Sequence, residues 1–520
     1  MPTPHNKSRI RWLPAAIIVV LTILAIILIW SLDAPHRQSQ VFYTVLVLIL
    51  SFLLMLLWLL FFSRLRWKVR LLAFSAIVLI LLLSTALFRM KGFSGDLVPL
   101  LEWRWTEKAA ESLTGSDPAP PGAFSKDYPQ FLGPHRNGTV QGIKLARDWE
   151  KSPPQLLWRQ PIGAGWSAFA VVGSSAVTQE QRGEYEMVVC YDLHSGQERW
   201  SHSDHDRYEA TPAGVGPRAT PTIVEDRVYT LGATGILNCL DLGTGECIWS
   251  EDILYDNGAE ITSWGMSGSP LVLDDLVVVS AGGPEGKSLV AYHKDTGERV
   301  WRDGSSPAGY SSPLITILAG VPQILIFNNR SVAAHDPNGG KVLWQHPWSS
   351  SYTECVAQPV PLLGDHVFVS SAYGIGCKLF QIARDEDNQL KATLVWETPR
   401  LKAKFTNVVH RDGYIYGLDD GVLVCLDLAD GQRRWKRGRY GHGQIILVDS
   451  PDGTRDQNNL LLVSAESGDI LLVEVNPEES KELARFPALA SKTWNNPALA
   501  GQYLLVRNDR EAACYELPLE

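Results

Sequence analysis

Three long apolar segments open the chain, and an alternating pattern of apolar and polar residues follows them. The segments span residues 13–30, 41–62 and 71–88, and none of them contains a charged residue. A helix rises ~1.5 Å per residue, so about 20 residues cross the ~30 Å hydrocarbon core of a bilayer. The pattern therefore predicts three transmembrane helices, whereas a cleaved signal peptide would account for only one segment.

Basic residues flank these segments unevenly. They are concentrated before the first segment and between the second and third, at Lys7, Arg9, Arg11, Arg64, Arg66, Lys68 and Arg70. The loop between the first and second segments holds only Arg37, which Asp33 offsets. The positive-inside rule then places the N-terminus in the cytoplasm and residue 92 onward outside, on the periplasmic side of a bacterial inner membrane. Arg89 and Lys91 alone oppose this orientation.

The rest of the chain repeats one phrase five times. It reads CLDLGTGECIW at residues 239–249, and the five copies end at Trp200, Trp249, Trp301, Trp344 and Trp435. An apolar run, a polar turn ending in glycine, and a second run closed by tryptophan are typical of a β-hairpin whose glycine has a positive φ. The turn glycines are Gly196, Gly245, Gly297, Gly340 and Gly431. An aspartate such as Asp241 can accept hydrogen bonds from the turn amides, and the tryptophan offers a large face for burial.

Two further strand-like runs precede each hairpin, as residues 220–224 and 227–231 precede residues 235–242. Weaker copies of the phrase close at Trp158, Trp396 and Phe486. A four-stranded unit of about 40–50 residues, repeated many times, is the signature of a β-propeller. We expect an all-β fold of eight four-stranded blades, in which the N-terminal strand at Trp158 completes the last blade and leaves no open sheet edge.

Charge and cysteine usage narrow the possible functions. Residues 1–91 sum to about +9 and the whole chain to −9, so residues 92–520 sum to about −18. A strongly acidic domain repels phosphate backbones, which makes nucleic acid an unlikely partner. The seven cysteines form no Cys-x-x-Cys pair, so a paired zinc site, a redox dithiol and covalent haem have no support. Cysteines at the same place in the repeat read as small buried strand residues, although an exported chain could form a disulfide.

The repeated phrase resembles the tryptophan-docking motif of the pyrroloquinoline-quinone (PQQ) type propellers, Ala-x-Asp-x-x-Thr-Gly-x-x-x-Trp. Asp241, Thr244, Gly245 and Trp249 match this motif, with Cys239 in the alanine position. The stretch DYPQFLGPHRNG also resembles the opening segment of bacterial PQQ-like propellers. Residues 126–520 are thus similar to a superfamily that includes quinoprotein alcohol and glucose dehydrogenases and the propeller lipoprotein of the outer-membrane barrel-assembly machinery. The resemblance implies that the tryptophans pack between blades and that the phrase is structural.

Residues 92–125 join the membrane anchor, residues 1–91, to the propeller. The stretch 97–113 reads either as an amphipathic helix at the membrane surface, where Trp103 and Trp105 would suit the interface, or as a plain juxtamembrane helix. Residues 116–125 are rich in proline and read as a semi-rigid spacer.

Candidate chemistry lies at the starts of the innermost strands. In a quinoprotein dehydrogenase, the resemblance implies, PQQ lies on the axis over a tryptophan floor, with calcium held by carboxylate and amide oxygens and an aspartate base. Candidate channel residues for binding such a cofactor are Trp264, Asn407, Trp494, Asn495 and Arg507, with Ser267, Asn496 and Asp509 beside them. The same residues could instead line a water-filled channel or form turns. No aspartate or glutamate begins an inner strand in a way that marks a calcium ligand or a base, so no metal site and no catalytic residue is assigned.

Two readings of function follow. We expect a membrane-anchored periplasmic propeller that acts as a binding or assembly scaffold for a protein or a small ligand. The basic stretch RRWKRGRY, residues 433–440, is either a solvated edge strand or a docking surface for an acidic partner. The alternative function is a membrane-bound, PQQ-dependent quinoprotein dehydrogenase that oxidises an alcohol or a sugar and passes electrons to membrane quinone.

Overall fold

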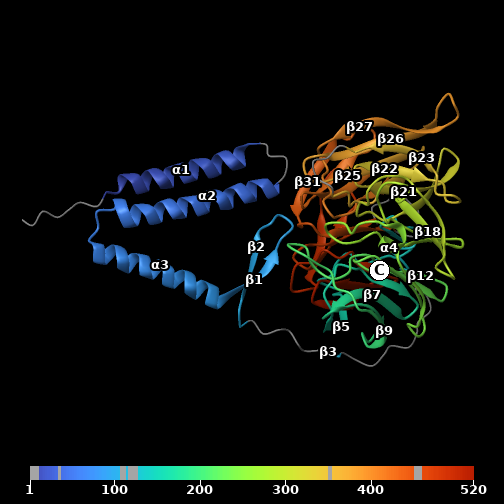
Figure 1. Ribbon diagram of the computed structural model, residues 1–520, viewed down its shortest axis with the longest axis horizontal. Coiled ribbons are helices and arrows are strands. Elements are labelled where there is room, and N and C mark those ends of the chain that lie inside the picture. Colours follow the sequence, from blue (N-terminus) through green and yellow to red (C-terminus); the bar gives the residue numbers. More distant parts are fainter. Residues whose placement is uncertain (1–10, 33–36, 106–112, 115–126, 349–353, 450–458) are drawn as a thin grey trace, which may run out of the picture. The chain divides into compact units, whose positions relative to one another are not determined.

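The computed structural model describes residues 11–32, 37–105, 113–114, 127–348, 354–449 and 459–520. The chain divides into two compact units, residues 1–108 and 109–520, which are described separately below (Figure 1).

The first unit contains the three predicted apolar helices. They are α1 (Leu13–Ser31), α2 (Arg37–Leu57), which continues as the π-helical turn η1 (Trp58–Phe62), and α3 (Trp67–Leu87). All three are long and apolar enough to cross a membrane. Most of their apolar side chains are exposed, as expected of helices that face lipid. Trp58 is an exception, because it is buried and its indole N–H donates to the carbonyl of Arg11 at 2.9 Å.

A β-hairpin follows α3 directly, formed by β1 (Phe88–Phe93) and β2 (Pro99–Trp103). The expectation of a helix beginning at residue 97 is therefore wrong over residues 97–103. Leu97 has a φ of +61°, which ends any helical path, and Pro99 has no N–H to donate to a helix turn. Exposure along Pro99–Trp103 alternates with a period of two, as in a strand. The remainder of the expected helix and the proline-rich spacer lie outside the described residues, apart from β3 (Leu113–Thr114).

The second unit is built mainly from eight sheets of four or five strands, numbered here in chain order, which are antiparallel apart from one parallel pair in sheet 7. Sheet 1 contains β6 (Ala170–Val172), β7 (Ser175–Arg182), β8 (Tyr185–Asp192) and β9 (Glu198–Asp204). Sheet 2 contains β12 (Thr222–Val224), β13 (Arg227–Leu231), β14 (Ile236–Asp241) and β15 (Cys247–Asp252). Sheet 3 contains β16 (Leu271–Leu273), β17 (Leu276–Val279), β18 (Leu289–His293) and β19 (Arg299–Asp303). Sheet 4 contains β20 (Leu314–Leu318), β21 (Val321–Asn328), β22 (Ser331–His335) and β23 (Val342–Pro347).

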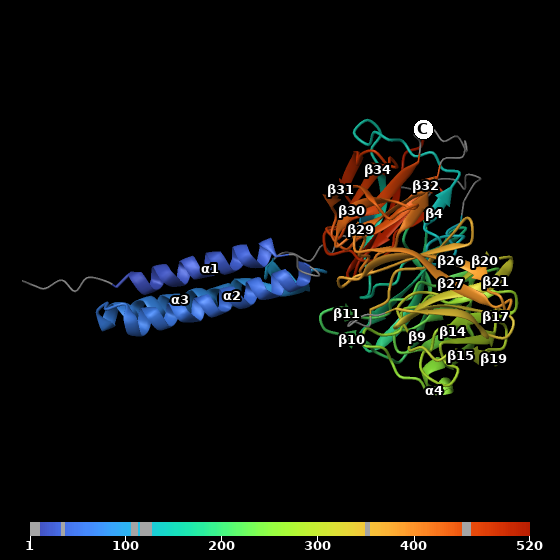
Figure 2. The same ribbon diagram turned by 90° about the horizontal axis from the view of Figure 1, so that it is seen from above.

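The later sheets repeat this order, and two of them gain a fifth strand. Sheet 5 contains β24 (Val360–Leu362), β25 (His366–Ser371), β26 (Gly376–Arg384) and β27 (Leu390–Thr398). Sheet 6 contains β28 (Val409–Arg411), β29 (Tyr414–Asp419), β30 (Val422–Asp427) and β31 (Arg433–Arg439). Sheet 7 contains β32 (Gln444–Asp449), β33 (Leu460–Ser464), β34 (Asp469–Glu474), β35 (Glu482–Pro487) and β4 (Thr139–Gln141), which pairs in parallel with β32 (Figure 2). Sheet 8 contains β36 (Ala498–Ala500), β37 (Tyr503–Arg507), β38 (Glu511–Glu516), β5 (Gln155–Pro161) and β3.

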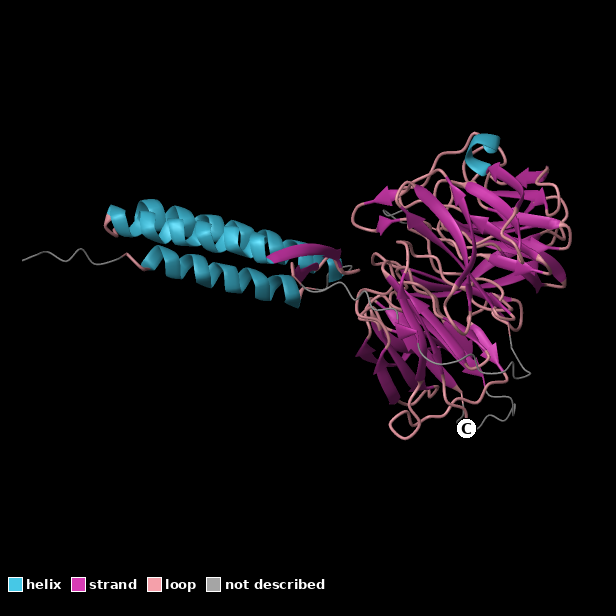
Figure 3. Ribbon diagram, turned by 90° about the horizontal axis from the view of Figure 1, so that it is seen from below, coloured by secondary structure: helices cyan, strands magenta, loops and turns pink. Residues whose placement is uncertain are grey.

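The predicted all-β propeller class is confirmed, and so is its closure. The strand β5 pairs with β38, and Trp158 lies opposite Cys514 in that register. The first strands of neighbouring sheets contact one another, so they form the inner wall of the propeller. The minor elements are a short hairpin, β10 (Glu209–Ala210) and β11 (Gly214–Val215), and the helix α4 (Ile253–Asn257) at the periphery (Figure 3).

The repeated phrase joins each sheet to the next through its tryptophan. The indole N–H of Trp158 donates to the carbonyl of Leu193 at 2.8 Å, and Trp200 donates in the same way to Leu242 of sheet 2. The ring of Trp158 also lies over Gly196, whose φ of +70° favours glycine. The small residue of the phrase lies opposite the tryptophan in the sheet, as Cys190 does to Trp200, which leaves room for the indole.

Trp344 of sheet 4 departs from this arrangement. Its indole N–H donates to Oε1 of Gln323 in its own sheet at 2.6 Å. The next sheet has an extended hairpin, in which residues 385–389 form the turn between β26 and β27. This turn contains no glycine, so the glycine against which the tryptophan packs in other sheets is missing here. Trp344 is buried in a cluster that includes Phe380 and Ile382 of that hairpin. Apolar packing therefore joins sheets 4 and 5 where the hydrogen bond to the neighbour is missing.

Candidate functional site

The residues just before each inner strand form a hydrogen-bonded belt around the propeller axis. In successive sheets, a backbone N–H donates to a side-chain oxygen of the next sheet at the equivalent position. The donor and acceptor pairs are Ala168 and Thr220, Thr220 and Ser269, Ser269 and Ser312, Ser312 and Gln358, Gln358 and Asn407, and Asn407 and Gln444, at 2.9–3.4 Å. A side chain at this position thus bonds to the neighbouring sheet, and the belt links sheets 1 to 7.

Asn407, a predicted cofactor residue, is a member of this belt. It is buried, and its Oδ1 accepts the backbone N–H of Gln358 at 3.0 Å. The amide oxygen that could have bound a cation or a cofactor is therefore engaged between sheets 5 and 6.

The pattern of hydrogen bonds in the belt is not repeated at sheet 8. Asn496 stands at the equivalent position, but its Oδ1 is buried without a hydrogen-bond partner. Asn495 beside it reaches sheet 1 instead, where its Nδ2 donates to the carbonyl of Ser167 at 2.8 Å. The Oδ1 of Asn495 and the hydroxyl of Thr406 are also buried without partners. Unpaired buried oxygens are uncommon in folded proteins, and they gather here around sheets 6 and 8.

Residues 127–142, which we call the lead segment, bond to several sheets on the other side of the belt. The carbonyl of Pro129 accepts the N–H of Ile223 in sheet 2, and β4 in this segment pairs with sheet 7. Arg136 is buried and donates to the carbonyls of Ser269 and Pro270 in sheet 3, at 2.9 and 3.0 Å. The lead segment thus bonds to sheets 2, 3 and 7.

Aromatic side chains form the opposite end of the axis, which we call the mouth. Trp494 contacts Trp166 of sheet 1 and Phe405 of sheet 6, with ring centroids 4.7 and 4.8 Å apart. The Nζ of Lys492 lies 3.9 Å from the ring centre of Trp494 and 4.9 Å from that of Trp166. Such cation–π contacts hold the ammonium group beside the rings. Burial lowers the pKa of Lys492, while Asp509 and Glu466 act in the opposite direction.

The carboxylates at the mouth are occupied by indole groups. The Nε1 of Trp494 donates to Oε1 of Glu466 at 2.9 Å, and Oε2 of the same glutamate accepts the N–H of His442. Trp264, another predicted cofactor residue, belongs to sheet 3, and its Nε1 donates to Oε1 of Glu354 at 3.1 Å. The structure thus brings Trp494, Asn495 and Asn407 together near sheets 6 to 8 and places Trp264 with sheet 3.

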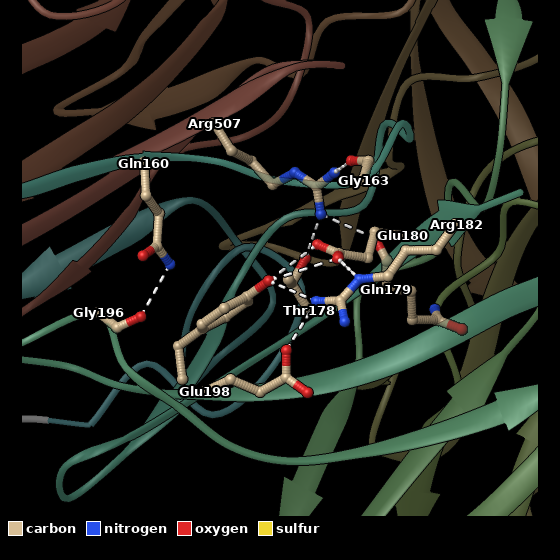
Figure 4. A network of polar contacts seen from close by, with 10 residues as sticks. Gln160, Gly163, Thr178, Gln179, Glu180, Arg182, Gly196, Glu198 and Arg507 are labelled. Carbon is tan, nitrogen blue, oxygen red and sulfur yellow. Dashed lines mark hydrogen bonds and ion pairs between the residues drawn. The ribbon is translucent and has the colours of Figure 1, made fainter. Parts of the chain in front are cut away.

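Arg507, the last predicted cofactor residue, ties sheet 8 to sheet 1 (Figure 4). It is buried and donates to Oγ1 of Thr178 at 2.7 Å, to the carbonyl of Gln179 at 2.8 Å and to that of Gly163 at 3.0 Å. Burial lowers the pKa of its guanidinium, and the nearby carboxylate of Glu180 acts against this. These contacts make Arg507 a link between sheets.

Glu180 anchors the polar network beside Arg507 (Figure 4). Its side chain is fully buried, pairs with Nε of Arg182 at 2.6 Å and accepts the hydroxyl of Tyr191 at 3.2 Å. Arg182 also bonds to Glu198 at 2.9 Å. A buried carboxylate is stable only when paired in this way, so the network is structural.

Two arginines near the inner strands carry positive charge within this acidic unit. Arg136 and Arg218 donate mainly to backbone carbonyls, which do not neutralise the guanidinium charge. Burial lowers their pKa values, to about 9 for Arg136 and about 10 for Arg218, because the charged form loses hydration. Sequence reasoning missed these two residues, and it missed Trp166 and Lys492 at the mouth. Trp166 could have been found, because it holds the same place before its inner strand as Trp494.

Several candidate donor groups for a calcium-bound PQQ are bonded to other protein groups. Calcium prefers several carboxylate and amide oxygens. Within the described ranges, no group of three or more His, Cys, Asp and Glu side chains is placed to hold a metal ion. Glu466 and Glu354 accept from indole N–H groups, and the amide oxygen of Asn407 belongs to the belt.

Comparisons with known proteins identify the family. A family model described as outer membrane protein assembly factor BamB matches residues 148–262 and 184–437. Two quinohemoprotein alcohol dehydrogenases share the fold. The enzyme from Comamonas testosteroni is 12% identical with a TM-score of 0.52 over 75% of this chain and 80% of that one, and ADHIIG from Pseudomonas putida HK5 is 13% identical with a TM-score of 0.51 over 76% and 81%. BamB from Moraxella catarrhalis is 14% identical, with a TM-score of 0.49 over 70% of this chain and 98% of that one.

A comparison with curated proteins finds no match. The solved structures are too distant in sequence to indicate more than the fold. The two matched ranges, however, together cover more than half of the chain, and they contain the repeated tryptophan phrase. This protein is therefore a member of the PQQ-like propeller family described as outer membrane protein assembly factor BamB.

Proposed function

We propose that this protein is a non-catalytic, membrane-tethered propeller that binds an acidic segment of a partner protein at the mouth. The observation that carries the proposal is the mouth, where the ammonium group of Lys492 lies against the rings of Trp494 and Trp166. On the other side of the belt the lead segment bonds to sheets 2, 3 and 7, which favours binding at the mouth. The family's description as an assembly factor supports a protein partner.

The mouth suits an acidic partner because cations and aromatic faces lie together there. Lys492 contacts Trp494 and Trp166, and Lys404 lies 5.8 Å from the ring centre of Phe405. Arg136 and Arg218 add positive potential within low-dielectric surroundings, where a charge acts over a longer range. The acidic exterior would repel the same partner elsewhere, so the charge pattern favours one docking position.

A charge-reversal experiment tests this site. The probe is a dye-labelled hexaglutamate peptide, and its fluorescence anisotropy is measured with the full chain in detergent at low salt. Lys492→Glu should weaken binding at least tenfold. Lys151→Glu is the matched control, because the Lys151 side chain is exposed and is distant from Lys492 in the sequence. This variant should leave binding nearly unchanged. Equal binding by both variants would contradict the proposal, as would equal binding of a hexalysine probe.

We also infer that the propeller lies in the periplasm. Three helices with basic flanks on one side support an inner-membrane protein whose residues from 92 onward lie outside the cytoplasm. Alkaline phosphatase fused after residue 520 should be active, because this reporter requires export. An inactive but stable fusion would contradict the orientation.

The alternative function is a membrane-bound PQQ-dependent dehydrogenase. The adjacent tryptophan rings of the mouth favour it, because a planar quinone needs an aromatic surface to lie against. The donor set argues against its calcium. Isothermal titration of PQQ with calcium into the full chain, followed by dye-linked assays with alcohols and sugars, distinguishes the two functions. Calcium-dependent micromolar binding with turnover would establish the enzyme, whereas no turnover would support the binding function.

A further inference from the structure

The β1–β2 hairpin has one face made entirely of exposed apolar side chains. Phe88 lies opposite Trp103, and Met90 lies opposite Leu101. Successive residues of a strand point to opposite faces, so these four side chains share one face. Their exposed fractions are 39%, 45%, 61% and 65%. Apolar groups gathered on an exposed face indicate an interaction site.

The other face of the hairpin carries an ion pair. Arg89 lies opposite Glu102, and the guanidinium and carboxylate pair at 2.9 Å. The hairpin is therefore two-sided, with apolar groups on one side and an ion pair on the other. This division is typical of an element that lies at a boundary between apolar and aqueous media.

Several contacts fix the hairpin at the end of the helical bundle. Its first strand begins at Phe88, the residue directly after α3. The backbone N–H of Arg104 donates to the carbonyl of Leu87 at 2.8 Å, which returns the second strand to the end of that helix. Asp96 in the hairpin turn pairs with Arg37 at 3.0 Å, and Arg37 is the first residue of α2. The hairpin thus bridges the ends of two of the apolar helices (Figure 1).

Aromatic residues cluster at this same end. Trp103 lies against Phe88 and Trp105, with ring centroids 5.2 and 5.6 Å apart. Trp30, near the end of α1, lies under the guanidinium of Arg37 at 5.3 Å. Tryptophans and arginines at the end of a membrane helix are typical of the headgroup region, where an amphipathic ring contacts both lipid and water.

We propose that the β1–β2 hairpin is a membrane-interface anchor whose apolar face, Phe88, Met90, Leu101 and Trp103, inserts among the lipids at the end of α3. The lipid interface is the occupant that the structure favours, because the apolar face begins at Phe88, directly after the apolar helix α3. The Arg37–Asp96 pair holds the hairpin turn at the level of the helix ends. The hairpin would then fix the direction in which the chain leaves the membrane.

Fluorescence quenching with the full chain in phosphatidylcholine–phosphatidylglycerol nanodiscs tests the anchor. Cys247→Ser removes the one exposed cysteine of the described chain and provides the background. An NBD probe is attached at Leu101→Cys or Met90→Cys, and at Lys151→Cys as the control. Quenching is measured with lipids that carry a nitroxide near the headgroup, and with aqueous iodide.

The proposal predicts that the probes at positions 90 and 101 are quenched by the nitroxide lipids and are at least fivefold less accessible to iodide than the probe at 151. Asp96→Asn should raise iodide quenching at position 101, because the turn is released from Arg37. Protection from both quenchers would mean that protein covers this face, and iodide quenching equal to that at 151 would mean that it faces water. Either result overturns the proposal.

Discussion

The ring of Trp158 lies so close to Gly196 that a Cβ added to the glycine would come within 2.6 Å of the indole carbon Cδ2. The same glycine is held by Gln160, whose Nε2 donates to its carbonyl at 2.8 Å (Figure 4). Glycine is therefore required at position 196 for two reasons, because both the positive φ and the close approach of the ring disfavour a side chain. This relationship joins sheets 8 and 1, where the propeller closes.

Gly196→Ala should destabilise the propeller more than Gly320→Ala does. Gly320 has almost the same φ, +71°, but has no atom within 4 Å of its added Cβ. Both variants incur the left-handed strain of about 1–2 kcal/mol, and Gly196→Ala adds about 1–3 kcal/mol of overpacking against Trp158. Urea unfolding followed by circular dichroism measures the difference. Equal unfolding midpoints would show that the contact with Trp158 contributes nothing.

Asn407→Ala should cost more stability than Asn496→Ala, although the two residues hold the same place in the repeat. Removing the Asn407 amide leaves the buried N–H of Gln358 without its acceptor, at a cost of about 1–3 kcal/mol. The Oδ1 of Asn496 has no partner, so its removal should be close to neutral. Thermal unfolding of the two variants checks this, and the reverse order would contradict the belt.

The free energy of unfolding should fall as the pH rises from the ordinary pKa of a glutamate to the raised pKa of Glu186. Burial raises the pKa of this carboxyl to about 7, while the backbone N–H of Ala233 acts in the opposite direction. Between about pH 4.5 and pH 7 the folded chain holds a proton that the unfolded chain has released, so unfolding is favoured by up to about 1.4 kcal/mol per pH unit. Glu186→Gln should remove this dependence and raise stability at pH 8.

The measurement is the urea midpoint of Glu186→Gln from pH 4.5 to pH 8, compared with the unchanged chain. Glu184→Gln, at an exposed glutamate in the same hairpin, is the control and should follow the unchanged chain at every pH. Parallel curves for all three proteins would show that Glu186 titrates normally.

A single cysteine should react in the native protein. Cys247 is exposed, and the other six cysteines are buried free thiols. Burial raises the pKa of Cys190 to about 11 and that of Cys355 to about 12, so their reactive thiolate is scarce at pH 8. Mass spectrometry after iodoacetamide treatment should find one modification in the folded protein and seven in 8 M urea. Unchanged unfolding midpoints with and without reductant would agree with the absence of disulfides among the described cysteines.

Sequence reasoning recovered the features that repeat along the chain. The tryptophan phrase is local, so its hairpin, its small residue opposite the tryptophan and its spacing can all be read from Trp200, Trp249 and Trp435. The belt is different, because each of its hydrogen bonds joins residues 37–52 positions apart and Ser, Thr, Asn and Gln are interchangeable within it. Residue type alone therefore indicates Asn407 as a candidate, and its partner Gln358 cannot be inferred from the sequence.

Other features could not be predicted because a segment suited a helix and a strand equally, or because a residue bonds to residues distant in sequence. Residues 97–105 contain aromatic and apolar residues at spacings that suit a helix and a strand equally, and Pro99 with the positive φ of Leu97 decides for the strand. Arg136 lies in a short turn, and nothing near it in sequence shows that it reaches Ser269 and Pro270 across the axis.

The pairing of β5 with β38 also sets the order in which the molecule can be completed. β5 is synthesised early, yet its partner follows about 350 residues later, which at about 5–20 residues per second means tens of seconds of waiting. During that time Trp158 and the unpaired edge of β5 are exposed to other chains. A nascent protein interrupted before β38 cannot close its ring and should be recognised as unfinished by proteases. Closure of the ring thus requires that β38 has been synthesised.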